Sequence, residues 1–139
     1  MENISKHISF LEATTSQTAI RKGINNDPSQ LHLENMQLLA KNVFEPLRHK
    51  FGAIRISSFF RSKALNTAIG GSKTSQHMTG EAIDIQGLNG VENRHLFEYI
   101  KNHLDFDQLI WEFGNQKNPA WVHVSYSGKK NRKQILYLK

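Results

Sequence analysis

Residues 75–84 of the chain read Ser-Gln-His-Met-Thr-Gly-Glu-Ala-Ile-Asp, which places a histidine and an aspartate on either side of a glycine. The last part of this stretch alternates in polarity, with Ile83 and Ile85 on one face and Asp84 on the other, and this predicts a strand with one polar face. The glycine-containing turn before it can fold His77 back over that polar face. The stretch therefore predicts that an imidazole and a carboxylate meet on one side of a sheet.

A second segment, Trp-Val-His-Val-Ser at 121–125, shows the same alternation. The pattern puts Trp121, His123 and Ser125 on one face of a strand and the two valines on the other. If this strand neighbours the one that carries Asp84, two imidazoles and a carboxylate converge.

Two histidines and one carboxylate form a ligand set that suits Zn²⁺. Three protein ligands leave the fourth tetrahedral position to water, so the set is typical of a catalytic site, where zinc lowers the pKa of that water to about 7. The HExxH helix of many zinc proteases is absent, which excludes that class. The chain contains seven histidines, and a lone histidine is more often a surface or core residue than a ligand, so spacing alone leaves that plainer interpretation open.

The rest of the chain predicts helices followed by a mainly antiparallel sheet, an α+β fold. After a turn at residues 25–28, one long helix ends near Gly52, because apolar residues recur every three and four positions. These residues are Met36, Leu39, Ala40, Val43, Phe44 and Leu47. Ser9 and Glu12 have capping-box spacing and open one or two helical turns over 9–22. Further patterns predict strands over 54–60, 81–86, 106–112, 121–126 and 134–138, and helices over 62–69 and 91–104.

Length and composition indicate one globular domain over residues 1–139, and we expect it to be a monomer. Hydrophobic residues make up 38% of the chain and charged residues 22%, which excludes the disordered and fibrous classes. The chain has no cysteine, and this excludes disulfides, cysteine-ligated zinc and thiol nucleophiles. Any metal must therefore bind to histidine and carboxylate.

The net charge of +6 lies entirely after Glu112, since the residues up to that point contain as many acidic as basic side chains. A basic end can attract an anionic polymer, either nucleic acid or a teichoic-acid-bearing wall, and a solvated lysine-rich turn is the plainer alternative. The run Lys129-Lys130-Asn131-Arg132-Lys133 has no stacking aromatics between its cations, and nothing in the chain matches a groove-reading motif. We therefore do not expect a nucleic-acid partner.

The pattern S-x-H-x-x-G-x-A-x-D at 75–84, together with W-x-H-x-S at 121–125, resembles the zinc D-alanyl-D-alanine carboxypeptidase family. That family includes D,D-carboxypeptidases and dipeptidases of bacteria and phages, and L-alanyl-D-glutamate endopeptidases used as endolysins. It shares its fold with the Hedgehog signalling domain. The similarity extends, more loosely, from about Glu12 to Tyr126. The resemblance implies an α+β fold of the Hedgehog and D,D-peptidase type.

The resemblance also implies roles for individual residues. His77, Asp84 and His123 would hold one Zn²⁺ ion. Arg61 matches the family arginine that stabilises the oxyanion of the tetrahedral intermediate, a role that suits a guanidinium directed at developing negative charge. A surface ion pair is the alternative for Arg61. Ser75 matches a position that contacts the substrate near the metal, with a local turn hydroxyl as its alternative.

The general base is the point at which the sequence departs from the family pattern. Many relatives have a glutamate three residues before the last histidine ligand, where this chain has Ala120. We assign the role to Glu112, the last acidic residue of the chain, which would take the proton of the zinc-bound water and pass it to the leaving amine. A glutamate exposed at the end of a strand is the alternative interpretation.

The resemblance implies a peptidase whose partner is a peptidoglycan stem peptide, with D-Ala-D-Ala carboxypeptidase and L-Ala-D-Glu-type endopeptidase activity both open. A catalytically inactive zinc-containing module of the same fold, which binds the cell wall or acts as a ligand, is the alternative. No apolar run approaches the roughly 20 residues that span a bilayer, and the first residues lack the layout of a signal peptide. We therefore expect synthesis in the cytoplasm and action on the cell wall after release, or as part of a phage virion.

Overall fold

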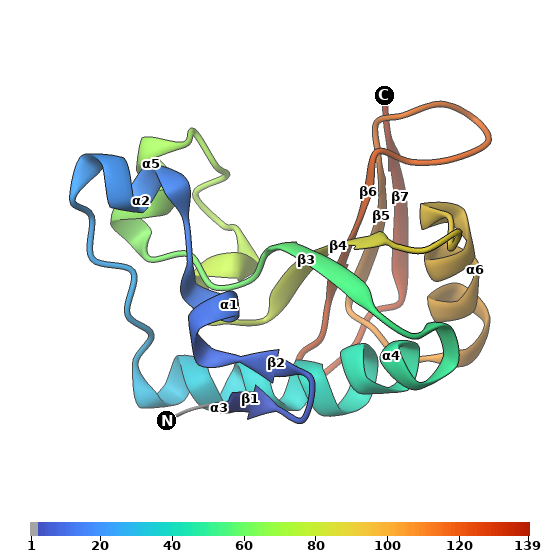
Figure 1. Ribbon diagram of the computed structural model, residues 1–139, viewed down its shortest axis with the longest axis horizontal. Helices are drawn as coiled ribbons and strands as arrows, with labels where there is room; N and C mark the ends of the chain where they lie inside the picture. The colour runs from blue at the N-terminus through green and yellow to red at the C-terminus, as the bar shows by residue number, and fades with distance from the viewer. Residues whose placement is uncertain (1–2) are drawn as a thin grey trace.

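Five strands form one sheet in the order β3-β4-β6-β5-β7 in the computed structural model, which describes residues 3–139. Neighbouring strands are antiparallel except for β5 and β7, which run parallel. The strands are β3 (Ile54–Ser58), β4 (Ala82–Gly87), β5 (Gln108–Glu112), β6 (Trp121–Ser125) and β7 (Gln134–Leu138). Helices pack on this sheet (Figure 1), so the predicted α+β class with a mainly antiparallel sheet is confirmed.

The alternation of residues in β4 and β6 gives the sheet one apolar and one polar face. The apolar face contains Ile83, Ile85, Val122 and Val124, all fully buried. On the polar face the strand register pairs Asp84 with His123 across β4 and β6. The two strands are therefore neighbours, which is the condition for their polar side chains to converge.

Two helical segments fill the core behind the apolar face. Helix α6 (Asn93–His103) contacts β4, β5 and β6 and buries Leu96, Phe97 and Ile100. The other segment is continuous and consists of α3 (Gln30–Leu39), η1 (Ala40–Phe44) and α4 (Glu45–Phe51). It ends at Gly52, as predicted, and its periodic apolar residues are buried in the same core. Its centre, η1, is a π-helical turn, which the apolar spacing does not predict.

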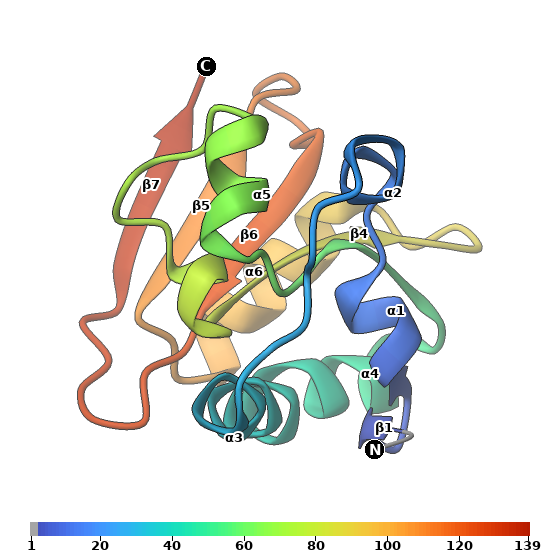
Figure 2. The same ribbon diagram turned by 90° about the vertical axis from the view of Figure 1, so that its left-hand side faces the viewer.

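The remaining elements are short, and they lie in the N-terminal part of the chain and between β3 and β4. They are the hairpin β1 (Asn3–Ser5) and β2 (Ile8–Ser9), α1 (Phe10–Thr14), α2 (Gln17–Lys22), α5 (Lys63–Ala68) and the 3-10 helix η2 (Gln76–Thr79). The Ser9 hydroxyl accepts the N–H of Glu12 at 3.0 Å, as predicted, but Ser16 caps α2 separately, so the 9–22 segment forms two helices. Helix α5 lies on the opposite side of the sheet from α6 in both views (Figures 1 and 2). None of the helices within residues 3–139 is both long and apolar enough to cross a bilayer.

The predicted strand at 54–60 is shorter in the structure. Strand β3 ends at Ser58, and the chain then turns Phe59 and Phe60 into the core, where they are 2% and 3% exposed. The aromatic residues that suggested a longer strand are therefore core residues that follow it. This turn delivers Arg61 to the polar side of the sheet.

The loop between β6 and β7 is held to the sheet by Asp107, whose side chain is only 6% exposed. Its carboxylate accepts hydrogen bonds from Nε and Nη2 of Arg132 at 2.8 and 2.9 Å, and from the Arg132 backbone N–H at 3.1 Å. Gln76 Nε2 donates a further bond of 2.9 Å. The hydrogen bonds from the Arg132 side chain have the largest effect on the pKa of Asp107. Together with the other bonds they lower it to about 2.

We expect Asp107 to stabilise the folded chain at neutral pH and to lose this effect in acid. Its folded pKa is lowered from 3.8 to about 2, so its contribution is complete well above pH 3.8 and fades as the pH falls toward 2. Asp107→Asn should lower the free energy of unfolding, measured by urea titration, at about pH 6, and the loss should shrink below about pH 4. Asp105→Asn is the control, because that carboxylate is 69% exposed and pairs with Lys133, which is itself 58% exposed. A loss from Asp107→Asn that does not change with pH would contradict the prediction.

Candidate metal centre

The turn that carries His77 is built by η2 and Gly80. Ser75 caps η2, and its hydroxyl accepts the N–H of His77 at 3.2 Å. Gly80 ends η2 with a left-handed φ of +79° and lies so close to α3 that an added Cβ would stand 2.6 Å from the carbonyl oxygen of His32. Because Gly80 reverses the chain, β4 starts two residues later and brings Asp84 alongside His77.

Gly80→Ala is expected to destabilise the fold by about 2–5 kcal/mol, because a left-handed backbone costs a non-glycine residue about 1–2 kcal/mol and overpacking adds about 1–3 kcal/mol. Gly70→Ala is the matched control, since Gly70 has a similar φ of +73° with open space around it. It should cost about 1 kcal/mol. Denaturant unfolding of the two metal-free variants measures both values. Equal losses would contradict the role given to the close approach of Gly80 and His32.

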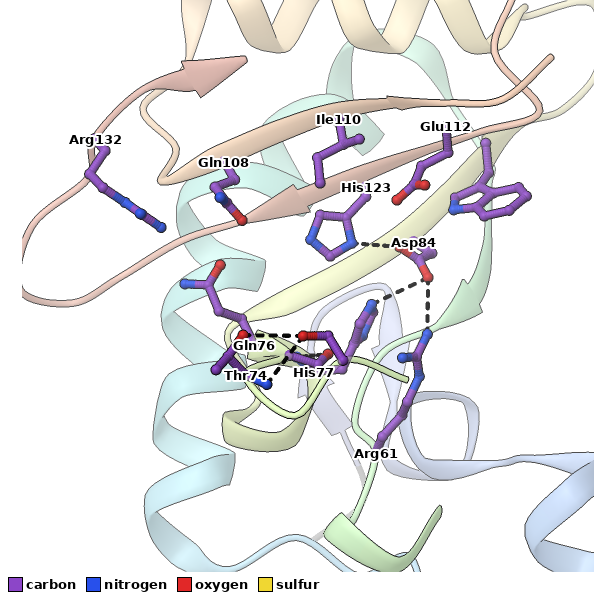
Figure 3. Close-up of a pocket in the computed structure, with 13 residues that line it drawn as sticks. Arg61, Thr74, Gln76, His77, Asp84, Gln108, Ile110, Glu112, His123 and Arg132 are labelled. Atoms are coloured by element: carbon purple, nitrogen blue, oxygen red, sulfur yellow. Dashed lines mark hydrogen bonds and ion pairs between the residues drawn. The ribbon is translucent and has the colours of Figure 1, made fainter. Parts of the chain in front are cut away.

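His77, Asp84 and His123 meet on the polar face of the sheet (Figure 3). His123 Nδ1 lies 2.9 Å from Asp84 Oδ1, and His77 Nε2 lies 3.2 Å from Asp84 Oδ2. Each residue offers one ligand atom, and the three atoms lie within 4.8 Å of one another. These distances allow the three side chains to share one metal ion.

The buried imidazole of His77 has one nitrogen that is suited to a metal ion. Its Nδ1 lies 2.7 Å from the carbonyl oxygen of Phe59, which can only accept, so Nδ1 carries the proton and Nε2 a lone pair. Nε2 is close to Asp84 Oδ2, but both atoms are then acceptors, and within residues 3–139 Nε2 has no hydrogen-bond partner. An imidazole that donates one N–H to a carbonyl and keeps its other nitrogen free is the usual arrangement of a metal ligand. The donor set therefore fits zinc.

The surroundings of the site favour the protonation states that metal binding requires. Burial lowers the pKa of His77, which keeps the imidazole neutral. Burial acts to raise the pKa of Asp84, but the hydrogen bond from His123 and the neighbouring imidazoles outweigh it, so this pKa is lowered and the group is ionised. Neutral imidazole and carboxylate are the forms that bind metal ions.

Arg61 lies beside this group with a side chain that is 17% exposed. Its Nη2 is 3.5 Å from Asp84 Oδ2, while Nε donates to Ser58 Oγ at 3.2 Å and Nη1 to Asn66 Oδ1 at 3.4 Å. The ion pair of Arg61 therefore lies inside the cleft and not on the outer surface. Three acceptors hold the guanidinium in place, and its contact with Asp84 is the longest of them.

Glu112, the last residue of β5, lines the same cleft and is half-buried. Its carboxylate points toward Asp84 and His123 in Figure 3. Burial raises the pKa of Glu112; the charge of Asp84 adds to this effect, and His123 and Arg61 oppose it. The backbone oxygen of Glu112 accepts the N–H of Ala120 at 2.9 Å, so Glu112 lies one strand away from the position where many relatives have their glutamate.

Ser75 lines the cleft as well, but its hydroxyl already accepts the backbone N–H of His77. The local turn role that was the alternative for this residue is therefore present in the structure. A contact of Ser75 with the substrate stays a proposal.

The cleft has a volume of about 530 Å³ and extends beyond the residues predicted from the sequence. The further lining residues are Ser72, Thr74, Gln76, Gln108, Ile110, Trp121 and Arg132. Alternation along β5 could have predicted Gln108 and Ile110, because they share a face with Glu112. Arg132 carries no such signal, because in the sequence it is one cation of a basic run.

A family model described as Peptidase M15 matches residues 6–125 of the chain. The chain belongs to the peptidase M15 family. The match confirms the resemblance to the zinc D-alanyl-D-alanine carboxypeptidases, and membership of the M15 family implies a hydrolase of the metallopeptidase class. The matched part of this M15 chain includes His77, Asp84 and His123 and ends before the loop that carries Arg132. A search of curated proteins found no match.

Proposed function

We propose that the chain is a zinc peptidase that hydrolyses a peptide bond in the stem peptides of bacterial peptidoglycan. His77, Asp84 and His123 would hold the single Zn²⁺ ion. The observation that carries the proposal is the buried His77 Nε2, which is oriented by Phe59 and left without a hydrogen-bond partner within residues 3–139 beside two other metal-binding side chains. Family membership supports the peptidase class.

The proposed reaction divides the work between the metal and two charged side chains. When bound, zinc held by three protein ligands supplies hydroxide from water at neutral pH. Arg61 donates hydrogen bonds to the negative charge that develops on the carbonyl oxygen of the scissile bond. The contacts with Ser58 and Asn66 support this role, because they hold the guanidinium in place before the substrate arrives.

Glu112 would act as the general base. It accepts the proton of the attacking water and passes it to the nitrogen of the leaving amine. Its raised pKa supports this role, since a carboxylate with a higher proton affinity is a better base near neutral pH. Ser75 would contact the substrate next to the metal, with its hydroxyl shared between that contact and the turn.

The substrate and site of action follow from the same proposal. Residues 1–139 would form a single catalytic domain that works as a monomer on the peptide part of the cell wall, after release from the cytoplasm or as part of a phage virion. The phage case would make the chain an endolysin-type enzyme. The basic residues after Glu112 support action on an anionic wall polymer.

Mass spectrometry of stem pentapeptides incubated with the zinc-loaded protein tests the proposal. Loss of the terminal D-alanine would identify a carboxypeptidase, and cleavage between L-alanine and D-glutamate an endopeptidase. A chelator should stop either reaction, and added zinc should restore it. Zinc binding and wall binding without cleavage of any peptide would favour the inactive module instead.

A further inference from the structure

The cleft continues past the metal centre to a second charged end. Glu112 and Arg61 lie at one end, and Arg132 lies at the other, beyond Gln76 and Gln108 (Figure 3). Arg132 is outside the part of the chain that matches the family, so family membership gives it no role.

Arg132 is held in a fixed position by a buried carboxylate. Asp107 accepts hydrogen bonds from Nε and Nη2 of the guanidinium, at 2.8 and 2.9 Å, and from the backbone N–H of the same residue at 3.1 Å. Gln76, which directly precedes the proposed ligand His77, donates at 2.9 Å to Asp107 Oδ2, the oxygen that also accepts from Nη2 of Arg132. The orientation of Arg132 is thereby linked to the turn that carries the metal ligand.

The guanidinium keeps one edge free for a ligand. An arginine has five N–H donors, and Asp107 uses one on Nε and one on Nη2, so both N–H groups of Nη1 and one of Nη2 remain. Within residues 3–139 these donors have no protein acceptor, and the side chain is 55% exposed. The nearby cation Lys133 is engaged instead with Asp105 at 3.2 Å.

We infer that Arg132 binds a free carboxylate of the peptide substrate. This inference rests on the proposed function, because it places that carboxylate at the far end of the cleft while the scissile bond lies at the metal. A planar guanidinium that is pre-oriented by one carboxylate matches the geometry of a second one. Stem peptides carry a free carboxylate at the C-terminal residue and another on the γ-linked D-glutamate, and both are α-carboxylates of an N-acylated amino acid.

Binding of three peptides to the zinc-loaded Glu112→Gln protein, measured by calorimetry, tests the inference. The peptides are the stem pentapeptide, the same peptide with a carboxamide on D-glutamate, and the same peptide with a C-terminal carboxamide. Adding Arg132→Gln should weaken binding of the pentapeptide about tenfold, the loss expected for a hydrogen bond to a charged group. For one of the two carboxamides the variant should change nothing, and that peptide identifies the carboxylate that Arg132 binds.

Two further variants separate recognition from loop structure. Lys133→Gln removes a neighbouring charge that does not line the cleft and should leave all three affinities unchanged. Arg132→Lys keeps the charge but loses the bidentate pairing with Asp107. We expect its loss of affinity for the pentapeptide to lie between zero and the loss caused by Arg132→Gln. An Arg132→Gln loss that is equal for all three peptides, a loss that Lys133→Gln reproduces, or no loss at all would overturn the inference. Absence of cleavage by the wild-type protein would defeat the proposed function, while the affinity ratios would still decide the role of Arg132.

Discussion

His77→Ala should abolish zinc binding and lower peptidase activity by about 10³-fold or more, because the metal stabilises the transition state by several kcal/mol. The side chain is 2% exposed, and its Nε2 is the atom of the site that most clearly lacks a partner within residues 3–139. Its removal leaves only two protein ligands, too few for a stable zinc site. Metal content after dialysis and mass spectrometry of digested stem peptides measure the two effects. Asp84→Ala should give the same result.

His103→Ala is the matched control for this experiment. His103 ends α6 as an exposed residue that stacks on Tyr99, and it does not line the cleft. The variant removes an imidazole of the same kind and should keep both zinc and activity. Circular dichroism should show unchanged helical content in all three variants. Retained activity in either His77→Ala or Asp84→Ala would refute the proposed mechanism.

The faces of β4 and β6 could be predicted from the sequence because a strand has a strict two-residue period. The alternation around Asp84 and around His123 predicts which residues lie on the same face of each strand. This prediction does not depend on which strands are paired in the sheet. The pairing of β4 with β6 joins segments far apart in the sequence. It depends on tertiary packing, in which Ile83 and Ile85 are buried beside Val124 and Val122. The sequence could therefore predict that the three candidate ligands converge only on the condition that the two strands are neighbours in the sheet.

Contacts between distant segments account for most of what the sequence did not predict. Asn26 was part of a predicted turn, yet it is 9% exposed and its amide bonds Thr14, Phe60 and Ser62, which fixes the approach to Arg61. Such a role depends on three segments that meet only in the folded chain. A single asparagine in a turn signal carries no pattern from which these partners can be derived.

Charged residues show the same division between local and long-range information. In the sequence Glu112 is distinguished as the last acidic residue of the chain, whereas the register of β5 against β6 determines that its carboxylate enters the cleft. In the sequence Arg132 is one of several cations in a basic run. Its pairing with Asp107, 25 positions earlier, separates it from Lys129 and Lys130, which are simply exposed. Composition predicts the sign of the charge on a surface, whereas the role of each charged residue depends on its tertiary contacts.

Glu112→Gln should lower kcat by about 10²–10⁴-fold, the usual contribution of a general base, and leave the zinc content unchanged. Glutamine has nearly the same shape but cannot take a proton from water. Within residues 3–139, Glu112 is not one of the three residues whose ligand atoms lie close together, so zinc binding should not depend on its carboxylate. The loss should appear in kcat more than in KM, since the proton transfer belongs to the transition state and not to substrate binding.

Glu98→Gln provides the comparison that makes the Glu112 experiment decisive. Glu98 is an exposed glutamate on α6, which packs on the other face of the sheet, so its replacement removes the same charge without touching the cleft. This variant should keep full activity. If Glu112→Gln were equally active, the proton would have to be taken by another group, and the departure from the family pattern at Ala120 would have a different compensation. A zinc-loaded but inactive Glu112→Gln protein beside an active wild type would also exclude the inactive module, because that module has no turnover to lose.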